Sequence, residues 1–430
     1  MKNPEQPVPQ HWAVRFFTIW SGQAFSLLGS ALVQFALIWW LTQETGSAVV
    51  LTMATLVAML PQVVLGPFAG AIVDRGSRRL IMMLADGAIA AFTLLLAWLF
   101  ATGQAQVWHV YVILAIRSLG GAFHFPAMAA STPLMVPEKH LTRISGLNQT
   151  LQGVIGMIAP PAGALLIEVL STQGVLMIDV VTAIIAILPL FFFTIPQPER
   201  KAPEAHEQPS SLFDDMRAGL RYVRSWPGLM TILGMAFFLN FLLTPTGSLM
   251  PLLITKHFGR GALEFGLMDS ASGLGMILGG LTLSIWGGFK KRIATSLTGI
   301  VGIGLGVMLT GAAPAGLFWL AVVGVSLSSF MSPVANGPLG AILQANVRPD
   351  MQGRVMALVG SVATAMTPLG LIIAGPFSDL FGIRTWYWAA GLLTILMGLA
   401  GFFIPAVMNV ESNREGVMEV PPQAALTSAD

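Results

Sequence analysis

The stretch Gly70-Ala-Ile-Val-Asp-Arg-Gly-Ser-Arg-Arg79 is a short charged connection between two long apolar segments, residues 47–73 and 79–101. The hydrocarbon core of a bilayer is about 30 Å thick, so a helix that crosses it needs roughly 20 apolar residues. Both segments meet this length, and the pattern recurs along the chain. We expect twelve spans, at residues 14–41, 47–73, 79–101, 108–131, 142–170, 174–194, 228–255, 262–288, 293–312, 315–345, 354–378 and 385–408.

The composition agrees with an all-α polytopic membrane protein. Hydrophobic residues make up 55% and charged residues 10% of the chain, whereas about a quarter of residues are charged in soluble domains. The pI of 9.1 arises from basic residues scattered through short loops, which suits an anionic lipid surface. We therefore expect the lipid bilayer, and no nucleic acid, as a partner. The first apolar segment is too long for a signal-peptide core and is expected to remain as a span.

The basic residues predict the orientation. Nearly all of the 22 Lys and Arg residues fall in alternate gaps between spans, together with the two ends of the chain. Only Lys256, Arg260 and Arg384 fall on the opposite side, and Arg117 lies inside a span. The positive-inside rule therefore predicts that both termini are cytoplasmic, in the cytoplasmic (inner) membrane of a bacterium.

A break in hydrophobicity from Ile195 to Trp226 divides the spans into two sets of six. In its second part Leu212, Met216, Leu220 and Val223 recur at helical spacing beside an arginine stripe, which indicates either an amphipathic helix on the membrane surface or a solvated loop helix. The predicted organisation is a tail (1–13), a six-helix bundle (14–194), a linker (195–227), a second six-helix bundle (228–408) and a tail (409–430).

The two halves resemble each other. Phe123-His-Phe-Pro126 in the first half corresponds to Phe330-Met-Ser-Pro333 in the second, and Arg143-Ile-Ser-Gly146 corresponds to Arg354-Val-Met-Ala357. Two repeated halves around a site at the membrane midplane are typical of secondary transporters. The repeat therefore predicts two pseudo-symmetric bundles.

The loop from Gly70 to Arg79 resembles the signature of the major facilitator superfamily, Gly-x-x-x-Asp-Arg/Lys-x-Gly-Arg-Arg/Lys, and departs from it at Ser77. The resemblance implies a conformational latch on the cytoplasmic side. Its residues would be Gly70, Asp74, Arg75, Arg78 and Arg79. Alternatively, the three arginines are only markers of topology. A weaker copy, Gly375-Pro-Phe-Ser-Asp379 with Arg384, ends the eleventh span, and the copy after the eighth span has no acid.

Charged residues inside spans are candidates for proton coupling. A cation in the membrane interior costs several kcal/mol unless it is paired or hydrated, so Arg117 must face the bundle interior or a wet cavity. The run Arg117-Ser-Leu-Gly-Gly121 is similar to a helix-4 motif of the superfamily whose Arg takes part in proton coupling; an interhelical structural role is the alternative. The acids inside spans, Asp86, Asp179 and Asp269, are the other candidates. In the family fold the third and sixth spans lie outside the cavity, so Asp86 and Asp179 could equally be packing residues.

The fifth span is similar to the exporter motif Gly-x8-Gly-x3-Gly-Pro-x2-Gly-Gly of the superfamily, with Gly146, Pro160 and Gly163 at matching positions. Small residues and proline give a bent, closely packed helix. Within the family this motif favours antiporters over uptake symporters, although general Gly and Ala packing gives a similar pattern. The expected substrate-cavity residues are Gln34, Phe35, Phe123, Phe237, Asn240 and Phe241.

Enzymatic and metal chemistry are not expected. The chain has no cysteine, and its 6 histidines show no metal-ligand spacing. The common nucleophile, zinc-protease and phosphate-loop motifs are absent from the sequence. We expect no catalytic residue, no metal and no cofactor.

Longer matches resemble the macrolide-efflux branch of the superfamily. They include Ile19-Trp-Ser-Gly-Gln-Ala24, Thr45-Gly-Ser-Ala48, Arg117 to Pro126 and Gly353-Arg-Val355. The resemblance implies a transporter that exports amphipathic drugs, macrolides above all, by proton antiport with alternating access. We expect it to be a monomer. A proton-coupled uptake carrier for a small nutrient and a non-transporting sensor with the same fold remain as alternatives.

Overall fold

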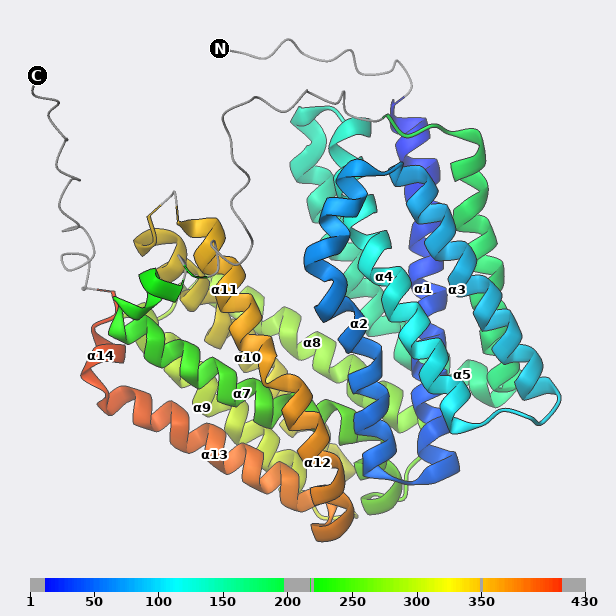
Figure 1. Ribbon diagram of the computed structural model, residues 1–430. Coiled ribbons are helices and arrows are strands. Elements are labelled where there is room, and N and C mark those ends of the chain that lie inside the picture. The colour runs from blue at the N-terminus through cyan, green and yellow to red at the C-terminus, as the bar shows by residue number, and fades with distance from the viewer. Residues whose placement is uncertain (1–11, 197–216, 218–219, 349–350, 412–430) are drawn as a thin grey trace, which may run out of the picture. The chain divides into compact units, whose positions relative to one another are not determined.

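Helices make up nearly all of the described chain (Figure 1). This computed structural model describes residues 12–196, 217, 220–348 and 351–411, without the side chains of Pro67, Ala71 and Asp74. No β-strand occurs among these residues. The elements are α1 (Trp12–Thr45), α2 (Ala48–Arg75), α3 (Arg78–Ala101), α4 (Val107–Met135), α5 (Glu138–Phe192), α7 (Pro227–Leu252), the π-helical turn η1 (Leu253–His257), α8 (Ala262–Trp286), α9 (Arg292–Ala312), α10 (Phe318–Asn346), α11 (Gln352–Ala365), α12 (Thr367–Phe381), α13 (Ile383–Phe403) and α14 (Pro405–Met408).

Among the described residues, 11 helical segments are long and apolar enough to cross a bilayer. One of them, α5, has 55 residues, about 80 Å of helix at 1.5 Å per residue, which is too long for one crossing. Its backbone leaves helical geometry at Ser171, with φ 59° and ψ 174°, between the predicted spans 142–170 and 174–194. The two arms of α5 are therefore two spans, and the predicted all-α polytopic fold is confirmed.

The predicted span 354–378 is interrupted. It divides into α11 and α12 at Met366, two residues before Pro368. Proline has no backbone N–H, so it cannot donate the hydrogen bond that a continuous helix requires. The apolar pattern alone gave no sign of this interruption.

The chain forms two compact units. The first contains residues 1–204, 247–273 and 371–383, and the second contains residues 205–246, 274–370 and 384–430. The division cuts through α7, α8 and α12. The first unit therefore includes one end of each of these three helices in addition to the helices that precede the linker.

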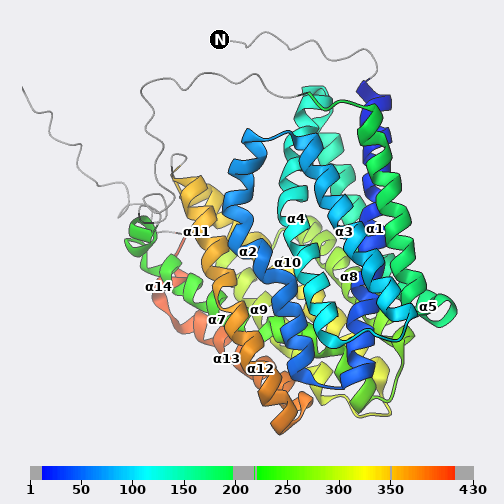
Figure 2. The ribbon, with the colours of Figure 1, turned by 45° about the vertical axis from the view of Figure 1, so that its right-hand side comes forward.

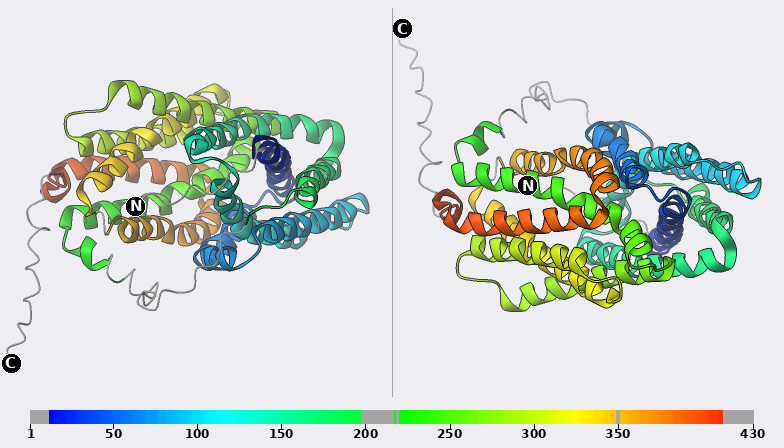
Figure 3. Two further views of the ribbon diagram at one scale, coloured as in Figure 1. Left: turned by 90° about the horizontal axis from the view of Figure 1, so that it is seen from above. Right: turned by 90° about the horizontal axis from the view of Figure 1, so that it is seen from below.

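In the first unit α1 packs along α5, α2 along α4, and α3 against both α4 and α5 (Figure 2). Viewed along its axis, α1 lies between the two arms of α5 (Figure 3). Gly29 permits the crossing with the second arm, because a Cβ atom there would collide with the side chain of Thr182. Polar side chains of α1 consequently face the interior of this unit.

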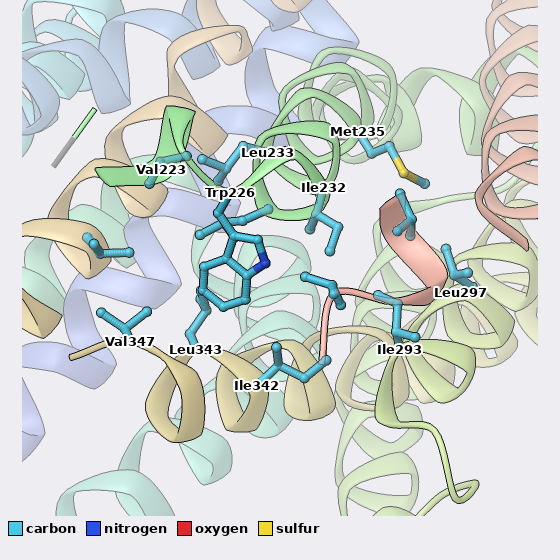
Figure 4. Packing of buried hydrophobic residues seen from close by; sticks show 14 of the residues in the cluster. Val223, Trp226, Ile232, Leu233, Met235, Ile293, Leu297, Ile342, Leu343 and Val347 are labelled. Carbon is cyan, nitrogen blue, oxygen red and sulfur yellow. The ribbon is translucent and has the colours of Figure 1, made fainter. Parts of the chain in front are cut away.

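In the second unit α9 packs along α10. Figure 4 shows a cluster around Trp226, where side chains of α7, α9 and α10 meet the short helical segment that ends at Arg224. Val223 of that segment is fully buried, whereas Arg221 and Arg224 are exposed. One apolar face and one charged face are what an amphipathic helix requires. The earlier positions of the predicted amphipathic helix, Leu212 and Met216, lie outside the described residues.

Candidate functional site

A buried ion pair joins α4 to the second arm of α5. Arg117 Nη1 lies 2.5 Å from Asp179 Oδ2, and the two side chains are 10% and 1% exposed. The carboxylate also accepts hydrogen bonds from Ser30 Oγ at 3.1 Å and Thr93 Oγ1 at 3.4 Å. Arg117 donates in addition to the carbonyl of Ser30 at 3.1 Å. Buried charges are tolerated when they are paired and hydrogen-bonded, and both conditions hold here.

A second polar group lies two helical turns further along α4. His124 Nε2 is 3.4 Å from Asp86 Oδ1 of α3, and the side chains are 14% and 7% exposed. Gln23 of α1 donates to the other carboxylate oxygen, Asp86 Oδ2, at 3.2 Å. Seven residues separate Arg117 from His124, so both side chains project from the same face of α4. This face of α4 therefore presents two basic side chains to the interior of the first unit.

Both groups border a cavity of about 390 Å³ in the first unit. The predicted candidates Asp86, Arg117 and Gln34 lie in its wall. Other polar wall residues are Gln23, Ser26, Ser30, Gln62, Ser118 and His124. The cavity therefore combines one ion pair, one further carboxylate and several neutral hydrogen-bonding groups.

A cavity of about 400 Å³ lies within the second unit, between α7, α9 and α10. None of the described residues that line it is charged. Aliphatic side chains alternate with amides and hydroxyls, namely Asn240, Thr246, Ser296, Ser328, Ser329, Ser332 and Asn336. Such a wall suits an amphipathic ligand, because pockets for small molecules are mostly apolar and carry a few placed polar groups.

The other predicted cavity residues lie elsewhere. Phe35 is 6% exposed, and its ring stacks on Phe265 of α8 with a centroid distance of 4.9 Å. Phe241 packs near Trp386, and Phe237 near its neighbour Phe238. Phe123 is half-buried and lines neither of the two described cavities. These four aromatic rings thus lie outside the walls of the two cavities.

Asp269, the fourth candidate for proton coupling, lies apart from the polar groups described above. It is an exposed residue of α8. Among the described residues it has no hydrogen-bond partner. The structure therefore brings together Arg117 and Asp179, and separately Asp86 and His124, but not Asp269.

The exporter-like segment of α5 forms a close contact with α8. A Cβ atom at Gly266 would lie 2.8 Å from the backbone oxygen of Pro160. Pro161 cannot donate to the carbonyl of Met157 four residues earlier; Ser270 Oγ donates to that carbonyl instead, at 2.7 Å. The proline pair thus opens the helix backbone, and α8 supplies the missing donor.

The two glycines of the exporter-like motif differ. A Cβ atom at Gly163 would lie 3.0 Å from the ring of Phe35, so this position requires a small residue, whereas a Cβ atom at Gly146 would meet no atom within 4 Å. Close packing therefore explains Gly163 and leaves Gly146 without a packing role in this structure.

The predicted latch loop contacts helix ends within the first unit. Arg78 Nη1 donates to the carbonyl of Ala130 in α4 at 2.9 Å, and Arg79 Nη2 donates to the carbonyl of Phe191 in the last turn of α5 at 3.0 Å. Cations near helix C-termini are favourable for the helix dipole. Ser77, where the motif departs from the family pattern, caps α3 by accepting from the amide of Leu80.

The remaining latch residues give less information. Arg75 is exposed, and the side chain of Asp74 lies outside the described part. We expected a close helix approach at Gly70, but a Cβ atom there would meet no atom within 4 Å. In this structure α2 approaches another helix, α12, closely at its N-terminal end.

At the N-terminal end of α2, the weaker motif copy contacts the first turn of the helix. Asp379 of α12 accepts from the backbone amides of Ala48 and Val49 at 2.9 and 3.2 Å, and from Ser47 Oγ at 3.0 Å. A Cβ atom at Gly375 would lie 2.9 Å from the Cα atom of Val49. A carboxylate at the first turn of a helix satisfies otherwise unpaired N–H groups and stabilises the helix dipole.

Our sequence interpretation assigned no role to His124 or Ser270. A signal for His124 was present, since it is the only histidine in the interior of a predicted span and lies seven residues from Arg117. Ser270 has no comparable signal, because its partner is a backbone carbonyl. Among the described residues, no group of three or more His, Cys, Asp or Glu side chains could hold a metal ion.

The sequence matches a known family and known proteins over most of its length. Residues 19–246 and 232–423 match the family described as Major Facilitator Superfamily. The chain is 34% identical over 389 residues to macrolide efflux protein A of Streptococcus pyogenes, covering 90% of this chain and 95% of that protein. It is 27% identical over 402 residues to the multidrug efflux pump Tap of Mycolicibacterium fortuitum, covering 89% and 94%.

Solved structures support the fold. A bacterial homologue of the human lysosomal transporter Spinster, in an inward-facing and unoccupied conformation, superposes with a TM-score of 0.67 at 12% identity, covering 97% of this chain and 100% of that chain. The nucleoside transporter NupG superposes with a TM-score of 0.63 at 14% identity, covering 91% and 98%. At these identities the likeness concerns the fold alone.

Proposed function

The chain belongs to the major facilitator superfamily, and from this membership we propose that it exports amphipathic drugs, macrolide-type antibiotics above all, by proton antiport with alternating access. The similarity to macrolide efflux protein A and to a multidrug efflux pump supports the substrate class and the direction. The protein acts as a transporter and not as an enzyme. It works as a monomer in the bacterial inner membrane, with both termini cytoplasmic.

The observation that carries this proposal is the contrast between the two cavities. The wall in the first unit holds Asp86, Arg117 and His124, which suits an ion-coupled step. The wall in the second unit holds only aliphatic, amide and hydroxyl groups, which suits a large amphipathic molecule. Proton coupling thus belongs to the first unit, and Asn240 with its polar neighbours contacts the drug.

Proton entry supplies the energy. One charge that crosses a potential of 100 mV contributes about 2.3 kcal/mol. This energy drives export only if proton and drug favour different conformations. We propose Arg117, Asp86, Asp179 and Asp269 as coupling candidates, Gln34 as a further cavity contact, and the loop from Gly70 to Arg79, with Asp74, as the cytoplasmic latch.

The test is a drug-susceptibility panel in an exporter-deficient bacterial host, with and without the protein and with and without a proton uncoupler. We expect the protein to raise resistance to macrolides at least severalfold, and the uncoupler to restore cellular drug accumulation. Proteoliposomes loaded with erythromycin report the direction. Macrolide sensitivity unchanged by expression would contradict the substrate class, uncoupler-resistant export would contradict antiport, and drug accumulation by expressing cells would indicate an uptake carrier.

A further inference from the structure

Two ionisable groups border the cavity of the first unit, and they differ in how they would respond to a proton. In the first, Asp179 is bonded to Arg117 at 2.5 Å and accepts from two hydroxyls. A proton on Asp179 would remove the counterion of Arg117 inside the membrane, which is costly for a buried pair. Of the two groups, this pair is therefore the less suited to take up the exchanged proton.

The second group, His124 with Asp86, contains a nitrogen atom without a hydrogen-bond partner. His124 Nε2 is buried and makes no hydrogen bond to any described residue, although Asp86 Oδ1 lies 3.4 Å away. The other oxygen of Asp86 is already occupied by the amide of Gln23. A proton on His124 would place a positive charge within 3.4 Å of the Asp86 carboxylate and would create an ion pair. A proton thus completes the second group, whereas it would disrupt the first.

We infer that His124 and Asp86 together form the proton-exchange site of this transporter, with Asp86 held by Gln23 and His124 accepting the proton. The inference rests on the antiport proposed above. In the exchange, one proton passes from water in the cavity to the imidazole nitrogen, and no covalent bond between heavy atoms changes. The net charge of the pair changes from −1 to 0, and drug and proton bind in competition because an antiporter must favour each in a different state.

Asp86 is the charged group that lies nearest to His124. From α1 it is faced by the neutral Gln23, from α2 by the neutral Gln62, and from α3 by Asp86. On its own helix the nearest charge is Arg117, which is bound to Asp179 of α5. Histidine is the side chain whose charge ordinarily changes between pH 5 and 8, the range in which a proton gradient operates across a bacterial membrane.

The first test needs no variant. Binding of erythromycin to the purified protein in detergent is measured from pH 8.5 to pH 5.0. Competition with one proton on His124 predicts that the affinity falls as the pH is lowered, and that the fall approaches tenfold per pH unit. An affinity that stays constant down to pH 5.5 would overturn the inference.

The second test counts protons. Erythromycin is added to protein at low buffer strength near pH 6, and the released protons are measured with a pH indicator. We expect close to one proton per bound drug from the wild type, and less than a tenth of that from His124→Gln, which can form hydrogen bonds but does not titrate. The matched control is His109→Gln, on the same helix but at its first turn, where His109 Nδ1 accepts from the amide of Gln106.

The outcomes separate the two proposals. Equal proton release from wild type and His124→Gln, with drug still bound, would reject the role of His124 and leave proton antiport intact. No release from the wild type, together with export that survives an uncoupler, would reject antiport itself. Asp86→Asn serves as the second variant, with release reduced at least threefold because His124 loses its counterion; unchanged release would contradict the pair.

Discussion

Asp379 caps the first turn of α2 by accepting the backbone amide of Ala48 at 2.9 Å. These residues are 331 positions apart in sequence, and Asp379 belongs to the weaker copy of the loop motif. The contact holds α12 against α2, with Gly375 allowing the close approach. Under the alternating access proposed above, a contact of this kind would be made and broken in each transport cycle, so the cap would contribute to the conformational equilibrium.

Replacing Asp379 with Ala should loosen this contact. Loss of a capping side chain costs about 1–2 kcal/mol, and about 1.4 kcal/mol corresponds to a tenfold change in population. The chain contains no native cysteine, so Val49→Cys can be labelled alone. We expect Val49→Cys to be labelled fivefold to tenfold faster when Asp379→Ala is also present. The acceleration should be smaller with Asp379→Asn, because Asn keeps an acceptor oxygen but has no charge. Equal rates in all three backgrounds would show that the cap does not hold α12.

The ion pair between Arg117 and Asp179 should behave as one unit in stability. Removing one partner leaves a buried charge without a counterion, which costs about 3–5 kcal/mol. Arg117→Gln and Asp179→Asn should each lower the melting temperature in detergent by several degrees, while the double variant should recover most of the loss. Additive losses in the double variant would mean that the two charges do not depend on each other.

Ser270 and Pro161 offer a double-mutant cycle. Ser270→Ala leaves the Met157 carbonyl without its donor and should cost about 1 kcal/mol. Pro161→Ala restores a backbone N–H that can reach the same carbonyl, so Ser270→Ala should cost almost nothing in that background. Melting temperatures of the four proteins give the coupling. Identical effects of Ser270→Ala in both backgrounds would contradict the proposed replacement of donors.

Gly266 should not tolerate a methyl group, because the added Cβ would meet the backbone oxygen of Pro160 at 2.8 Å and backbone cannot move aside easily. Gly280, on the same helix, has no atom within 4 Å of an added Cβ and is the matched control. We expect Gly266→Ala to lose macrolide resistance at equal membrane expression, and Gly280→Ala to keep it. Full resistance with Gly266→Ala would argue against this contact.

Hydrophobic length predicted the spans well because the thickness of the membrane imposes it on each helix separately. The break at Ser171 fell between two predicted spans for this reason. The interruption at Met366 was not foreseen, although Pro368 gives a local reason for it. Membrane thickness therefore accounts for the first break, and the missing N–H of Pro368 accounts for the second.

The candidate site was predicted only in part. An isolated charge in an apolar span must find a partner, so Arg117 and Asp179 could be named, but their pairing depends on how α4 meets the second arm of α5. The contact between His124 and Asp86 and the cap by Asp379 depend on helices that are distant in sequence. Such contacts come from packing, and no single stretch of sequence encodes them.

The uncharged wall around Asn240 and Asn336 has a consequence for evolution. Its side chains differ in shape and hydrogen bonding but none carries charge, so replacing one with another neutral residue leaves every ionisable group of the first unit unchanged. If the drug binds this wall, as proposed above, single substitutions in it would alter the resistance spectrum and leave the proton-coupling groups unchanged. Substrate range and proton coupling would then evolve separately.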